Sequence, residues 1–231
     1  LALSASHVPF LKEPKKERPI IQDEDMNALL SAPPDTKRGA RDRMIMILLY
    51  DTAIRIAELL ELKVASVKMA SVPCIHIHGK GDKERIVSIT EATARHLKKY
   101  LKQYHSEMIP NKPLFYTKIK GTTGPMSPGN VVRIINKYAD EIRGEHPNLP
   151  EHLHCHMFRR TRATGLYRNG VELEMISVIL GHSSTETTRI YASPSLEMLE
   201  DAMQNANSTI PDETPEWKGN EDELARICGL R

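Results

Sequence analysis

One short stretch of strand-like alternation interrupts a sequence whose apolar residues otherwise recur at helical spacing. Residues 74–78 (CIHIH) and residues 85–89 (RIVSI) each alternate in polarity. Between them lie residues 79–82 (GKGD), and glycine and aspartate tolerate the positive φ angles that tight turns need. The sequence therefore predicts a β-hairpin within a fold of the α+β class, predominantly α-helical with a small antiparallel β-sheet.

Helical signals occupy most of the remaining chain. Residues 41–52 are apolar on several faces, which predicts a buried helix. Side-chain oxygens that can cap a first turn are expected at Asp23, Thr90 and Ser127, and glycines that follow a helix end stand at positions 170 and 181. The expected helices cover residues 23–30, 41–52, 54–63, 90–106, 127–140, 157–169, 172–180 and 193–205, with a last one opening at residues 220–223.

The composition limits the environment of such a chain. Three cysteines among 231 residues, Cys74, Cys155 and Cys228, are too few and too odd in number for a disulfide framework, which favours a reducing compartment. The longest apolar run, residues 44–50, is too short to cross a bilayer. We therefore expect a cytoplasmic protein with no membrane partner.

Charge is distributed unevenly along the sequence. The chain has 32 Lys and Arg against 30 Asp and Glu, a net charge of +2. Residues 193–231 hold 3 basic and 9 acidic residues, a net charge of −6, which leaves +8 on residues 1–192. A basic body can bind a polyanion although the total charge is near neutral.

Two terminal segments differ from the body of the chain. Residues 1–19 alternate prolines with basic residues, which predicts an extended basic linker. Because the chain opens at Leu1, without a methionine, we expect a preceding domain to be missing. Residues 208–231 are expected to form an acidic connector and a C-terminal helix, with an apolar stripe formed by Leu224, Ile227 and Cys228.

Four separated segments hold residue types that are unusual for their surroundings. Arg55 stands in an otherwise apolar helix start, where a guanidinium needs a partner or an incoming anion. The other segments hold Lys80 at the hairpin tip, His156 and Arg159 on one helix face, and His182 followed by Tyr191.

Each of these residues also has an ordinary structural interpretation. Arg55 can pair with Glu58, three residues further along the helix. The remaining alternatives are a solvated turn lysine for Lys80, a helix cap for His156, a helix C-terminal partner for His182 and a packing residue for Tyr191.

Their order and spacing are more specific than any one of them. The pattern Arg…Lys…His-x-x-Arg…Leu-Gly-His…Tyr, and above all residues 156–192 (HMFRRTRATGLYRNGVELEMISVILGHSSTETTRIYA), resembles the catalytic domain of the tyrosine recombinase (phage integrase) family. The resemblance covers roughly residues 20–205. It implies the tyrosine-recombinase catalytic-domain fold for residues 20–207 and a site-specific DNA recombinase that integrates or excises a mobile element.

The resemblance also implies roles for single residues. Tyr191 would attack a DNA phosphodiester and form a 3′-phosphotyrosyl link, while Arg55 and Arg159 would hold the two non-bridging oxygens. Lys80 would protonate the leaving 5′-oxygen, with Lys83 as a rival for that role. His156 would assist proton transfer at the tyrosine, and His182 would hydrogen-bond the scissile phosphate. Glu58 would orient the region of the first arginine.

These residue types suit the chemistry. A phenol has an ordinary pKa of about 10, so it needs a base or nearby cations to act as a nucleophile at neutral pH. Arginine stays charged and offers donors in a fixed fork, which suits charge that grows on phosphate oxygens. We therefore expect no metal, no other cofactor and no ATP. One departure from the family pattern is Ala53, where the family usually has glycine, and we expect it to be tolerated.

Other functions remain open. Histidines in alternation, at positions 152, 154 and 156 beside Cys155 and at positions 76 and 78, could hold a metal ion. A non-catalytic DNA-binding module would have no use for Tyr191. A type IB topoisomerase shares the chemistry, and Xer-like chromosome-dimer resolution is an alternative to a mobile element.

The expected partners are double-stranded DNA, other protomers in a DNA-bound tetramer and accessory directionality proteins. The missing preceding domain would itself bind DNA, and the C-terminal helix would pack on a neighbouring protomer. We expect association with the nucleoid of a bacterium, or an origin in a phage or mobile element. Candidate phosphate contacts are Lys12, Lys15, Lys16, Lys83, Lys98, Lys99, Arg133, Arg160 and Arg162.

Overall fold

The computed structural model describes residues 19–79, 83–119, 121–182, 185–189, 198 and 226. The chain divides into two compact units, Leu1–Ala192 and Ser193–Arg231, and the architecture below is that of the first. Four predicted elements lie outside the described residues: the linker before residue 19, the turn at residues 80–82 and, apart from two single residues, the two C-terminal helices. Among the helices that are described, none has the length and hydrophobicity needed to cross a membrane.

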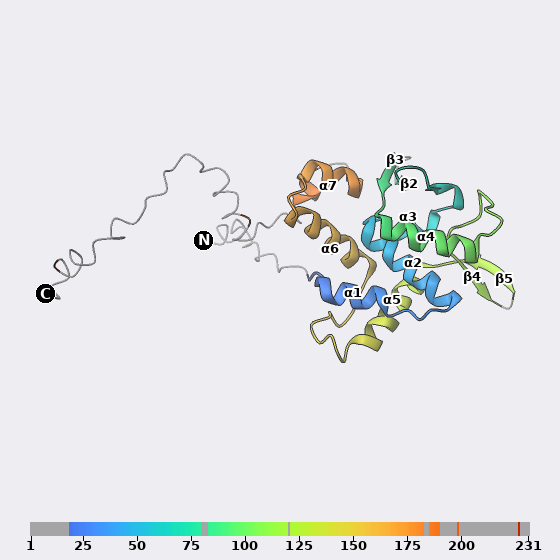
Figure 1. The fold of residues 1–231 in the computed structure, drawn as a ribbon, viewed down its shortest axis with the longest axis horizontal. Helices are drawn as coiled ribbons and strands as arrows, with labels where there is room; N and C mark the ends of the chain where they lie inside the picture. Colours follow the sequence, from blue (N-terminus) through green and yellow to red (C-terminus); the bar gives the residue numbers. More distant parts are fainter. Residues whose placement is uncertain are drawn as a thin grey trace, which may run out of the picture. The chain divides into compact units, whose positions relative to one another are not determined.

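The predicted α+β class, mainly helical with small antiparallel sheets, is confirmed (Figure 1). The helices are α1 (Asp23–Ser31), α2 (Lys37–Asp51), α3 (Ile56–Glu61), α4 (Glu91–Tyr104), α5 (Pro128–Ile142), α6 (Cys155–Arg168) and α7 (Leu173–Leu180), with 3-10 turns at Val64–Ser66 and Thr185–Thr187.

Several predicted helix ends are corrected by the backbone. Helix α1 begins at Asp23 itself, after Gln22, so Asp23 is its first residue and not its cap. Helix α2 begins earlier than predicted because the Thr36 side chain accepts from the Gly39 N–H. Helix α3 is shorter than residues 54–63. The caps at Thr90 and Ser127 are confirmed, since their side chains accept from the N–H groups of Thr93 and Asn130.

The predicted hairpin forms the larger sheet. Strands β1 (Val67–Lys68), β2 (Cys74–Gly79) and β3 (Lys83–Ser88) are antiparallel, with β2 in the middle. A second hairpin, β4 (Tyr116–Ile119) with β5 (Thr122–Pro125), was not predicted. The described residues of β5 are largely exposed, so no alternation of apolar side chains marks this strand in the sequence.

Helix α2 forms the centre of the core. Its residues 44–49 are all apolar and at most 8% exposed, because α2 packs against α1, α3, α4, α5 and α6. A smaller cluster joins α6 to α7 through Ala53, Ala163, Ile176 and Leu180. Helix α7 also lies near β3 (Figure 1). It is thus placed between α6 and the hairpin.

Ala53 lies in the left-handed region of backbone conformation. This residue connects α2 to α3, and its φ angle is 49°. Its side chain is fully buried in the small cluster that joins α6 to α7. An L-residue in this conformation costs about 1–2 kcal/mol, which glycine avoids. The alanine expected to be tolerated therefore occupies a position where the backbone favours glycine.

Substitutions at Ala53 should separate backbone strain from packing. We expect Ala53→Gly to change the free energy of unfolding by less than about 1 kcal/mol, because relief of strain offsets a lost buried methyl and a more flexible unfolded chain. We expect Ala53→Val to lower it by more than about 2 kcal/mol, since a β-branched residue is strained at positive φ and overfills the site. Urea unfolding followed by circular dichroism measures both, and equal values for the two variants would contradict the left-handed conformation.

Candidate active site

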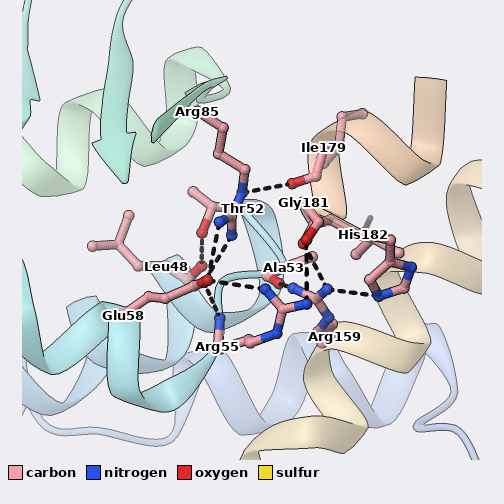
Figure 2. A network of polar contacts seen from close by, with 11 residues as sticks. Leu48, Thr52, Ala53, Arg55, Glu58, Arg85, Arg159, Ile179, Gly181 and His182 are labelled. Carbon is pink, nitrogen blue, oxygen red and sulfur yellow. Dashed lines mark hydrogen bonds and ion pairs between the residues drawn. The ribbon is translucent and has the colours of Figure 1, made fainter. Parts of the chain in front are cut away.

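Three arginines from different elements converge on the C-terminal end of α7 (Figure 2). Arg85 donates from Nε to the Ile179 carbonyl at 3.1 Å. Arg159 donates from Nη2 to the Leu180 carbonyl at 2.7 Å, and Arg55 donates from Nη2 to the Gly181 carbonyl at 3.3 Å. The last carbonyls of a helix have no partner within it, and they form the negative end of the helix dipole. The end of α7 is therefore an acceptor site for several cations.

Gly181 shapes this acceptor site. Its φ angle of 62° ends α7 in the left-handed conformation, as predicted. The N–H of Gly181 bonds the Val178 carbonyl and that of His182 bonds the Ser177 carbonyl, which is the Schellman arrangement. A Cβ at position 181 would lie 2.9 Å from the Arg85 side chain, so glycine is also needed for this close approach.

Arg159 is held deep in the protein. It lies on α6 and is 1% exposed. Its Nη1 donates to the Ala53 carbonyl at 2.6 Å, and its Nη2 donates to the Leu180 carbonyl and lies 2.9 Å from Nε2 of His182. The backbone conformation at Ala53 thus directs a carbonyl at this guanidinium.

His182 is neutral in this arrangement. A guanidinium has only donors, so Nε2 of His182 must accept from Arg159, and the ring proton on Nδ1 is donated to Oγ1 of Thr188 at 2.9 Å. Burial and the positive charges of Arg159, Arg55, His156 and Arg85 lower the pKa of His182 to about 4. The predicted hydrogen bond to a phosphate stays a prediction, and it would require His182 to exchange one of these two partners.

Arg55 pairs with Glu58, as the structural interpretation of the sequence expected. Glu58 accepts from the Arg55 backbone N–H at 3.0 Å and from Nη1 at 2.9 Å, so it caps the first turn of α3 and holds the side chain at once. The Arg55 side chain is 42% exposed, which corrects the expectation of a guanidinium within apolar surroundings. It is accessible to an anion from solvent.

Arg85 was missed by the analysis of the sequence. Its Nη1 and Nη2 donate to the two oxygens of Glu58 at 3.0 and 2.8 Å. The signal was present in the alternation of β3, because Arg85 has the same phase as the buried Val87 and Ile89. An arginine on the buried face of a strand needs an anionic partner, and that partner is Glu58.

Glu58 therefore joins two guanidinium groups. Burial alone would raise the pKa of its carboxyl, but hydrogen bonds from Arg85 and from the Arg55 backbone outweigh burial and lower the pKa to about 2. The carboxylate is 6% exposed and is charged at neutral pH.

Other predicted site residues are placed as follows. His156 is exposed on the first turn of α6, and its charge contributes to the lowered pKa of His182. Lys80 and Tyr191 lie outside the described residues, so their roles stay predictions. The same holds for Lys12, Lys15 and Lys16, and for the side chain of Lys83.

Two of the predicted phosphate contacts have partners within the protein, and their roles at DNA stay predictions. Arg160 is 8% exposed, and its Nη1 donates to the Pro19 carbonyl at 2.9 Å, which places it inside the protein. Arg162 bonds the carboxylate of Asp51 at 3.2 Å and lies over the Tyr50 ring. Neighbouring residues on a helix face different sides, which the run of basic residues in the sequence did not reveal.

The possible metal ligands do not gather. No group of three or more His, Cys, Asp or Glu side chains suited to a metal ion occurs within the described part of the chain. Cys155 is buried and begins α6, while His152, His154 and His156 are exposed.

Replacing Glu58 should destabilise the protein. Glu58→Gln leaves the guanidiniums of Arg55 and Arg85 without this carboxylate, so we expect the free energy of unfolding to fall by roughly 2–4 kcal/mol. Glu61→Gln, at the exposed end of α3, is the matched control and should change it little. Chemical denaturation at pH 7 measures both, and equal stabilities would show that the carboxylate does not hold the arginines.

His182 should make stability depend on pH. Its pKa of about 4 in the folded state lies below the value of about 6.5 expected in an unfolded chain. The unfolded chain therefore binds the proton more tightly, and the free energy of unfolding should fall as pH drops from 6.5 to 4.

Substitution of His182 tests this dependence. Urea titrations across that pH range should show a smaller fall in the free energy of unfolding for His182→Asn than for the wild type. Asparagine keeps an acceptor for Arg159 but does not titrate. His152→Asn, an exposed histidine, is the control. An unaltered pH profile in His182→Asn would contradict the depressed pKa.

Comparison with known proteins assigns a family. Residues 19–198 match the model of the Phage integrase family. The tyrosine recombinase XerC of Staphylococcus epidermidis is 31% identical over 205 residues, which cover 86% of this chain and 67% of that relative. The chain thus spans about two thirds of the length of XerC.

Solved structures agree in fold. The crystal structure of XerA recombinase has a TM-score of 0.68 at 26% identity, over 85% of this chain and 68% of XerA. The post-cleavage complex of XerH site-specific recombinase with a palindromic difH substrate has a TM-score of 0.66 at 27% identity, over 82% and 53% of the two chains. With its fold and most of its length matched, the chain belongs to the phage integrase family of tyrosine recombinases.

Proposed function

We propose that this chain cleaves and rejoins double-stranded DNA at specific sites through a covalent phosphotyrosyl intermediate. The observation that carries the proposal is the placement of Arg55 and Arg159 on adjacent carbonyls at the end of α7, with His182 bonded to Arg159. These residues come from segments far apart in the sequence. Two fixed guanidiniums at one point suit the non-bridging oxygens of a single phosphate.

The chemistry follows from the residues assigned by the sequence pattern. The phenol oxygen of Tyr191 forms a bond to phosphorus, and the bond from phosphorus to the 5′-oxygen breaks. The phenol proton passes to His156 or water, and the leaving 5′-oxygen takes a proton from the ammonium group of Lys80. Rejoining is the reverse, with the 5′-hydroxyl attacking the phosphotyrosyl bond, so the proposal needs neither ATP nor a metal.

The arginines supply the electrostatic stabilisation. Arg55 is partly exposed and can meet the phosphate directly, whereas Arg159 now donates to carbonyls and an imidazole. A phosphate oxygen is a stronger acceptor than these neutral groups, so we expect it to replace one of them when DNA binds. Each such donor can contribute roughly 2.7–4 kcal/mol to the transition state of a reaction in a water-excluded site.

A basic groove supports DNA as the partner. This groove, of about 430 Å³, lies between the start of α2, strand β4 and helix α5, and it was not predicted apart from Arg133. The similarity to XerH, whose structure contains a difH substrate, supports the same partner. The cationic side chains lining the groove are Arg38, Arg41, Lys118, Arg133 and Lys137, with Asp42 as the acidic one.

The names of the relatives favour a second candidate for the biological role. XerC and XerA relatives match most of this chain, so an Xer-like recombinase is an alternative to the mobile-element role predicted from the sequence. A DNA-bound tetramer, exchange of the C-terminal helix, accessory proteins and association with the nucleoid remain proposals for either role.

Trapping on suicide DNA tests the proposed reaction. The probe is a pool of nicked duplexes with randomised arms, in which cleavage releases a short 5′-hydroxyl fragment and leaves the protein joined to DNA. We expect a covalent adduct with the wild-type chain and loss of at least about a thousandfold with Tyr191→Phe, because the nucleophile is removed. Gel separation under denaturing conditions measures it, and sequencing the trapped DNA identifies the site.

Control reactions show whether the adduct forms through Tyr191 and whether it needs a metal. Tyr167→Phe, a tyrosine of α6, should form the adduct as the wild type does. Each reaction is run with and without EDTA, and loss of the adduct on adding the chelator would favour the metal-site alternative. An adduct that persists in Tyr191→Phe would show that another residue is the nucleophile.

A further inference from the structure

Arg85 is a charged group beside the arginine pair that the proposed reaction does not use. We propose that Arg85 is a positioning residue, which fixes the β2–β3 hairpin against α3 and α7 so that Lys80 and the two arginines act on one phosphate. The inference rests on the proposed function. It adds a residue that lies outside the Arg, Lys, His, Arg, His and Tyr pattern of the sequence.

On the hairpin, Arg85 is built into the sheet. It pairs in register with Ile77, which is 1% exposed, and the next pair along the hairpin on the same face is Ile75 with Val87. The backbone of Arg85 is therefore part of the paired strands of the hairpin. Lys80 stands five residues before it in the same hairpin.

Toward the site, the same side chain contacts two other elements (Figure 2). It bonds both oxygens of Glu58 on α3, at 3.0 and 2.8 Å, and the Ile179 carbonyl on α7, at 3.1 Å. The side chain is 10% exposed and packs so closely on Gly181 that a Cβ there would collide with it. One guanidinium thus joins β3, α3 and α7.

Only arginine can make this connection. Its three nitrogens lie in one plane and here serve three acceptors, whereas the single ammonium of lysine cannot bond both Glu58 oxygens and a carbonyl in the same geometry. The substitution Arg85→Lys would keep the charge and lose the fixed placement. The contacts therefore predict a requirement for shape as well as charge.

Glu58 makes the expected defect selective. It accepts from Arg55 through both the backbone N–H and the side chain, independently of Arg85. If Arg85 is replaced, Glu58 can still hold Arg55, while the hairpin loses its bonds to α3 and α7. The arginine pair should then remain in place, and proton donation from the hairpin should fail.

The leaving group of the DNA provides the test. In one substrate the scissile 5′-bridging atom is oxygen, which needs a proton from Lys80 as the P–O bond breaks. In the other it is sulfur, and the P–S bond breaks to a thiolate that needs no proton. Both are suicide duplexes with the sequence recovered in the trapping experiment, and the rate of adduct formation is measured in single turnovers with the 231-residue chain.

We expect Arg85→Lys and Arg85→Ala to cleave the oxygen substrate about 10- to 100-fold more slowly than the wild type, as misplacement of a catalytic group does. On the sulfur substrate both variants should approach the wild-type rate. Arg95→Ala and Arg95→Lys, at an exposed arginine of α4, are matched controls and should equal the wild type on both substrates.

Three results would overturn the inference. They are wild-type rates for both Arg85 variants on the oxygen substrate, an equal loss on the two substrates, and full rescue of the oxygen reaction by lysine. If the wild type forms an adduct, these results leave the proposed function standing. A wild type that forms none on either substrate would overturn the proposed function together with the inference.

Hydrogen exchange gives a reading that does not depend on catalysis or on the stability of Arg85→Ala. In Arg85→Lys, we expect faster amide exchange in residues 83–89 and unchanged exchange in α4. Unchanged exchange in the hairpin would overturn the proposal, because the hairpin would then be fixed without Arg85.

Discussion

The geometry of the candidate active site depends on holding three positively charged arginines close together. Arg55, Arg85 and Arg159 all reach the end of α7, and their mutual repulsion opposes folding. Two features offset it: the negative end of the α7 dipole, whose last carbonyls have no partner within the helix, and the carboxylate of Glu58 between Arg55 and Arg85. Without either feature, the cations could not be placed so closely.

In the proposed function, this arrangement presents oriented cations to an anion before any substrate binds. The scaffold orients the guanidiniums, and in the proposed reaction a phosphate oxygen has only to replace one neutral acceptor of Arg159. Burial, together with the positive charges of these arginines, lowers the pKa of His182 and keeps its ring neutral, with Nε2 accepting from Arg159. A neutral histidine avoids adding a further positive charge to a crowded cationic site.

Local elements were largely predictable, because their signals are short-range. The alternation of residues 74–78 and 85–89 predicted the hairpin, and Thr90, Ser127 and Gly181 marked helix ends as observed. The second hairpin was missed because few of its side chains are buried. Burial of Arg160 was missed because a run of basic residues does not show which side of a helix faces the core.

By itself, the sequence predicted the fold class, most of the helices, the larger hairpin and the family resemblance, and it named Arg55, Arg159 and His182 as candidate site residues. Only the tertiary structure decided which of them meet. Arg55 bonds a carbonyl 126 positions away, and Arg85 became part of the site because its strand face turns toward Glu58 and α7. Such contacts depend on how helices and strands pack, and local propensity carries no information about partners so distant in the chain.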